Sequence, residues 1–103
     1  MAGIAGIAGR YESLLAKMLE RIKYRGPHET WTTGEGSFVI GCNELNVGGD
    51  CPINSHYASK EKTRVVMDGR VYNRKSPGMT DAQAMLQIYH DHGCRFAEKV
   101  DGD

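Results

Sequence analysis

The sequence predicts a domain of the α+β class, because strand-like and helix-like segments alternate along it. Residues 37–47 and 63–73 are rich in Val, Ile, Phe and Tyr, as β-strands are. Residues 12–24 and 80–93 instead place apolar side chains at helical intervals. With an apolar opening at residues 2–8, the expected order is strand, helix, two or more strands, helix.

Length and composition restrict the class of protein. The chain has 103 residues and zero formal net charge, so we expect a single domain over 1–103 that does not bind nucleic acid. No apolar stretch is long enough to span a membrane, and the opening lacks the basic flank of a secretion signal. Cys42, Cys51 and Cys94 form no C-x-x-C pair, which indicates reduced thiols in a cytoplasmic protein.

The opening segment GIAGIAG has only two bulky side chains, Ile4 and Ile7. A strand this poor in bulk can lie where other backbone approaches closely, so we expect it to be an interior strand. The first helix follows, with one apolar face, and Gly26-Pro27 ends it. Trp31 is then expected in a loop, as a contact residue or partly buried in the core.

The second half of the chain contains the clearest local signals. Gly, Pro, Asn and Asp predict turn and loop over residues 48–62, and Asp-Gly at 68–69 between apolar runs predicts a hairpin turn. Thr80 and Gln83 have capping-box spacing at the start of the second helix, and Gly93 suits its C-terminal cap.

The segments GIAGI, RGPHE, DGRVYN and TDAQAMLQIYHDHG…FAEKVDGD resemble, in this order, the glutaminase domain of asparagine synthetase. That family is the class II glutamine amidotransferases, with the N-terminal-nucleophile hydrolase fold. The resemblance implies a partial αββα sandwich, since the family domain is about twice as long. In the family, removal of Met1 exposes a cysteine whose thiolate attacks glutamine, with its own α-amino group as general base. Ala2 stands at this position and cannot act as a nucleophile.

The resemblance also assigns family roles to other positions. Glu44 stands where an arginine holds the glutamine carboxylate, and Asp68 stands at the asparagine of the oxyanion hole. The Gly69 N–H can still donate to an oxyanion, and Asp81 matches the aspartate that binds the substrate amino group. Arg70 replaces a glutamate, and we expect it to form an ion pair with Glu44. Residue 2 is expected beside the bend at 68–69.

These departures predict a module without glutaminase activity that acts in binding, regulation or assembly. Two alternatives remain: a glutamine-hydrolysing domain that carries an engineered alanine, and a purely structural oligomerisation unit. The expected partners are a second copy of the chain or a separate synthetase-like protein, together with a small amino-acid-like ligand. No cofactor or membrane partner is expected.

The remaining His and Cys side chains predict no metal site and no new nucleophile. His90 and His92 are two residues apart on a helix and point about 200° apart, so they cannot chelate one ion together. With Cys94 they predict a solvated helix end. Cys42 and Cys51 have no identifiable general base and are expected to be structural thiols.

Overall fold

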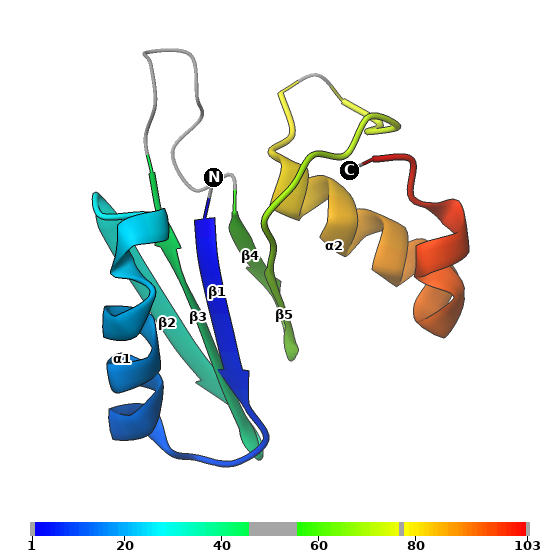
Figure 1. The fold of residues 1–103 in the computed structure, drawn as a ribbon. Coiled ribbons are helices and arrows are strands. Elements are labelled where there is room, and N and C mark those ends of the chain that lie inside the picture. The colour runs from blue at the N-terminus through cyan, green and yellow to red at the C-terminus, as the bar shows by residue number, and fades with distance from the viewer. Residues whose placement is uncertain (1, 46–55, 77, 103) are drawn as a thin grey trace.

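The computed structural model describes residues 2–45, 56–76 and 78–102. Its elements are β1 (Ala2–Ile7), α1 (Glu12–Arg21), the 3₁₀ turn η1 (Lys23–Arg25), β2 (Glu29–Glu35), β3 (Phe38–Glu44), β4 (Tyr57–Lys60), β5 (Thr63–Val66), α2 (Asp81–His92) and the 3₁₀ segment η2 (Gly93–Lys99). The strands form two antiparallel sheets, with the orders β1-β3-β2 and β4-β5. Figure 1 shows the layers in the order α1, three-stranded sheet, two-stranded sheet, α2. The predicted α+β class is confirmed.

The central strand of the larger sheet is β3, which pairs with β1 on one side and with β2 on the other. Ala2 lies opposite Glu44 in one pairing, and Trp31 lies opposite Cys42 in the other. The expectation of an interior opening strand is therefore wrong: β1 is an edge strand in the described part of the chain. No other described strand pairs with the outer side of β1, because β2 pairs with β3 and β4 pairs with β5.

Helix α1 covers one face of this sheet. Leu15 and Leu19 pack on Val39, and Ala5, Ile7 and Ile22 lie around this cluster. Gly41 permits the close approach, because a Cβ there would lie 2.8 Å from Leu19 Cδ1. The Asn43 Nδ2 group donates to the Leu19 carbonyl oxygen at 2.7 Å and so satisfies one carbonyl at the end of α1.

The smaller sheet corrects two predictions. Residues 57–60 form β4 instead of a loop, and the tight hairpin turn lies at Glu61 and Lys62, where Glu61 has a φ of 54°. The predicted strand over 63–73 ends at Val66, and Asp68-Gly69 forms a bend rather than a hairpin. Beyond the bend, Val71 bridges to Gly102 instead of continuing the β4–β5 ladder.

Helix α2 has the predicted capping box. Thr80 Oγ1 accepts a hydrogen bond from the Gln83 N–H at 3.2 Å, and Gln83 Oε1 accepts one from the Thr80 N–H at 2.9 Å. Gly93 ends the helix with a φ of 60°. The buried face of α2 contributes Ala84 and Ile88 to a second core around Val71, so the predicted helix is confirmed with both of its caps.

The two sheets contact each other through side chains of β2 and β3 on one side and of β4 and β5 on the other. Trp31 lies in β2, not in a loop, and its ring stacks on Tyr57 of β4 with a centroid distance of 4.1 Å. Arg64 Nη2 donates to Glu35 Oε2 at 3.2 Å. Neither helix of the described residues has both the length and the hydropathy of a membrane span.

Candidate functional site

The structure brings residue 2 and the bend at 68–69 together, as the resemblance implies. The backbone N–H of Ala2 donates to Asp68 Oδ1 at 3.1 Å. Arg25 Nη2 donates to the other carboxylate oxygen of Asp68 at 2.7 Å, and Arg25 Nε donates to the Ala2 carbonyl at 3.0 Å. A three-way contact therefore joins the start of β1, η1 and the bend that follows β5.

This contact determines what the site can do chemically. Ala2 is 1% exposed and presents only a methyl group. The Asp68 side chain is paired with Arg25 as a carboxylate, and a carboxylate accepts hydrogen bonds but cannot donate one. Gly69 follows Asp68 in the bend. The Ala2 methyl group cannot attack a carbonyl carbon, and the Asp68 carboxylate cannot donate a hydrogen bond to an oxyanion.

The local chain geometry at Arg25 depends on Gly26. A Cβ at position 26 would collide with the carbonyl group of Asn43, so only glycine permits this approach to β3. Pro27 follows, and the His28 N–H then donates to the Glu44 carbonyl at 3.0 Å as the chain enters β2. The Gly-Pro pair thus ends the helical segment and fixes the position from which Arg25 reaches β1.

Glu44 lies at the end of β3, and its side chain is 1% exposed. Its Oε1 is 3.3 Å from His56 Nδ1 and also accepts a hydrogen bond from the His56 backbone N–H at 3.3 Å. The expected ion pair with Arg70 is wrong, because no ion pair within the described residues joins these two side chains. Arg70 is exposed and lies beyond the bend, where the chain turns toward Gly102.

Asp81 is the first residue of α2, and its carboxylate is already engaged within the chain. Asp81 Oδ1 accepts hydrogen bonds from the Val71 N–H at 2.9 Å and from Arg74 Nη2 at 2.8 Å. Arg74 Nη1 also donates to the Met79 carbonyl at 2.8 Å. This carboxylate therefore holds Val71 and Arg74 at the start of the helix.

Three of the predicted site residues, Asp68, Glu44 and Asp81, thus have a basic partner inside the chain. The partners are Arg25, His56 and Arg74. Sequence reasoning assigned none of them a role. Arg25 belongs to the RGPHE motif, which could have indicated a role in the site. His56 lies in a segment predicted as loop, and Arg74 follows DGRVYN without any motif of its own.

The thiols and histidines form no second reactive centre in the described residues. Burial, followed by the nearby Glu44 and Glu29 carboxylates, raises the pKa of Cys42 to about 12, so its thiol stays protonated. Cys94 is exposed, and Cys51 lies outside the described residues. Across 2–45, 56–76 and 78–102, no three His, Cys, Asp or Glu side chains are placed to hold a metal ion.

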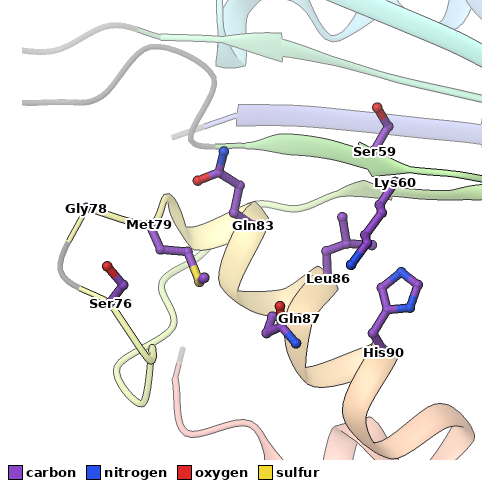
Figure 2. A pocket seen from close by; sticks show the side chains of 9 residues that line it. All are labelled: Ser59, Lys60, Ser76, Gly78, Met79, Gln83, Leu86, Gln87 and His90. Carbon is purple, nitrogen blue, oxygen red and sulfur yellow. The ribbon is translucent and has the colours of Figure 1, made fainter.

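A cavity of about 510 Å³ runs along α2 beside β4 (Figure 2). Its lining residues are Ser59, Lys60, Ser76, Gly78, Met79, Gln83, Leu86, Gln87 and His90. The polar side chains on α2 are partly committed elsewhere: Gln83 closes the capping box, and Gln87 Nε2 donates to Asp91 at 3.0 Å. Figure 2 shows Lys60 reaching from β4 toward His90 on α2. None of the predicted site residues lines this cavity.

A second cavity, of about 600 Å³, opens between the sheets and α2 and is mostly apolar. Phe38 and Ile40 of β3 line one side, and Val65, Met85 and Phe96 are among the residues that line the other. Neither cavity contains the contact between Ala2 and Asp68. Comparisons of the chain with models of protein families, with curated proteins and with solved structures found no match.

Proposed function

We propose that this chain is a relative of the glutaminase domain of asparagine synthetase that does not hydrolyse glutamine and serves as an assembly module. The order of its layers supports the relationship, because α1, two sheets and α2 stack as in the αββα sandwich of the N-terminal-nucleophile hydrolases. The position of Ala2 beside Asp68 supports it further, since the resemblance pairs these two positions in one catalytic centre.

The observation that carries the proposal is the set of bonds at Asp68. In place of an amide that donates to a developing oxyanion, the site holds a carboxylate bonded to the Ala2 N–H and to Arg25. Loss of one oxyanion donor lowers kcat by about a hundred- to a thousandfold, and a negative charge there repels the intermediate as well. The missing nucleophile removes the covalent step altogether.

The internal partners of Glu44 and Asp81 favour assembly over binding of an amino acid. A glutamine molecule in the family's pose needs a cation for its carboxylate and a free carboxylate for its ammonium group. Glu44 offers the wrong charge and is buried against His56, and Asp81 is held by Arg74. Binding in that pose would have to break the ion pair between Asp81 and Arg74. The free energy lost with this pair exceeds the free energy gained from an exposed contact with the ligand.

The test is the variant Ala2→Cys, assayed for ammonia release from glutamine. Intact mass must show that Met1 has been removed, and thiol labelling must show that the introduced thiol is accessible. We expect ammonia release at the level of the unchanged chain, which serves as the matched control. Ammonia release that requires glutamine and stops on alkylation of the new thiol would overturn the proposal, and would favour an active domain carrying an engineered alanine.

A further inference from the structure

The outer edge of β1 has backbone groups without a partner among the described residues. β1 pairs with β3 alone. In an antiparallel pair, both backbone groups of one residue point to the same side, and alternate residues point to opposite sides. Because the Ala2 N–H and carbonyl bond to Asp68 and Arg25, outside the sheet, the same groups of Ile4 and Gly6 also point away from β3.

The three outward positions differ in how they are covered. Asp68 and Arg25 occupy both groups of Ala2, so that end of the edge is closed to another strand. Ile4 is 46% exposed and Gly6 is also exposed. The free part of the edge therefore offers two N–H donors and two carbonyl acceptors, from Ile4 and Gly6.

The sequence of β1 has none of the features that prevent an exposed edge from pairing with another strand. Proteins blunt exposed edges with charged side chains, proline, bulges or very short strands. β1 has six residues, AGIAGI, with no charge and no proline, and its register against β3 runs without a bulge. The opposite edge strand, β2, carries Glu29 and Glu35.

We propose that β1 pairs with β1 of a second copy of this chain, antiparallel, about a two-fold axis at Ala5. Ile4 then lies opposite Gly6 of the second copy, and Gly6 opposite Ile4 of the second copy. Each of these two pairs exchanges two N–H···O=C bonds, so the free groups of both copies are all used. The result is one continuous six-stranded sheet made from two three-stranded ones.

The occupant is a second copy because the edge matches itself. Its free groups lie symmetrically about Ala5, and its side chains carry no like charges that would meet across the axis. The exposed Ile4 side chain lies opposite Gly6 of the second copy, which has no side chain to obstruct it. Two-fold pairing of one surface with itself is also the commonest form of homo-oligomer.

The dimer rests on the assembly role proposed above, but not on the absence of glutaminase activity, which the Ala2→Cys assay measures separately. Ammonia release by Ala2→Cys would leave the dimer standing. If the chain is monomeric and Ala2→Cys releases no ammonia, the dimer proposal is wrong and the proposal of no glutaminase activity is unaffected.

A cross-link at Ala5 tests the register. At the axis, Ala5 faces Ala5 of the second copy in a pair without hydrogen bonds, where the Cα atoms are about 4.5 Å apart, within the disulfide range of about 4.4–6.8 Å. We expect Ala5→Cys, with Cys51 and Cys94 replaced by Ser, to form a covalent dimer under mild oxidation. Ala8→Cys in the same background is the matched control, because position 8 does not face itself in this register. Equal cross-linking of the two variants, or none in either, would overturn the proposal.

A second pair of variants tests the backbone bonds. Ile4→Pro removes the outward N–H without removing a bond to β3, and proline is tolerated on the open side of an edge strand. Ile4→Ala loses the same side chain but keeps the N–H. Circular dichroism must show that both variants are folded, and sedimentation then measures the dimer Kd. We expect Ile4→Pro to dimerise at least about tenfold more weakly than Ile4→Ala. Equal constants for the two folded variants, or unfolding of Ile4→Pro alone (which would place its N–H in the β1–β3 ladder), would contradict the pairing.

Discussion

The carboxylate of Glu44 lies 3.3 Å from the imidazole Nδ1 of His56, and the two side chains are 1% and 8% exposed. This buried pair joins the end of β3 to the start of β4, across the interface between the two sheets. The buried Glu44 carboxylate therefore has hydrogen-bond partners within the chain, the ring and the backbone N–H of His56.

We expect His56→Ala to lower the free energy of unfolding by about 3 kcal/mol, because it leaves the buried Glu44 carboxylate without its basic partner. Glu44→Gln should cost less, about 1 kcal/mol, since a neutral amide needs no counter-charge. Urea unfolding of the two single variants and the double variant measures the coupling between the side chains. If both single changes fall within about 0.5 kcal/mol of the unchanged chain, the pair has no structural role.

The stability of the chain should fall at alkaline pH because of Cys42. The folded chain holds its pKa at about 12, against 9.0 for an unperturbed thiol, mainly because the side chain is buried. The unfolded chain therefore releases this proton first. Between pH 9.0 and about pH 12, the pKa values of the thiol in the unfolded and the folded chain, the free energy of unfolding falls by about 1.4 kcal/mol for each pH unit.

Cys42→Ala is the matched control for this pH dependence. Between about pH 8 and pH 10, the unchanged chain should lose about 1.4 kcal/mol more than the variant does. Burial, followed by the Glu29 and Glu44 carboxylates, also raises the pKa of Tyr57; these causes are the same in both proteins, and only the smallest one, Cys42 itself, differs. Identical pH profiles would contradict a buried, protonated Cys42.

The capping box of α2 gives a prediction about local stability. Thr80→Ala removes the oxygen that accepts from the Gln83 N–H and should lower the free energy of unfolding by about 1 kcal/mol. Thr80→Ser keeps a hydroxyl and should stay within about 0.5 kcal/mol of the unchanged chain. Equal losses in thermal or urea unfolding would show that the methyl group of Thr80, and not its hydroxyl, matters.

Local patterns predicted the elements whose signals lie within a few residues. The Thr80–Gln83 capping box, the glycine cap at Gly93 and the apolar run of β3 are features of this kind. The α+β class followed from them. The strands β2 and β4 were not predicted, because their sequences, ETWTTGE and YASK, are largely polar and their stability comes from pairing and from the stacking of Trp31 on Tyr57.

The candidate site was predicted only in part. The contact between Ala2 and Asp68 followed from the resemblance, although the two residues are far apart in the sequence. The basic partners Arg25, His56 and Arg74 were not predicted, because ion pairs between distant segments leave no periodic signal. The expected pairing of Glu44 with Arg70 failed for the same reason: charge complementarity in a sequence does not determine which side chains meet.

Binding of L-glutamine, followed in ¹⁵N–¹H NMR spectra, tests the central claim most directly. Asp68, Glu44 and Asp81 already have basic side chains of the same chain as partners. The backbone signals of these residues and of Ala2 should therefore not move as glutamine is added to about 10 mM, a concentration that detects a binding free energy as small as about 3 kcal/mol. Saturable shifts confined to these signals would contradict the account and would show an open amino-acid site.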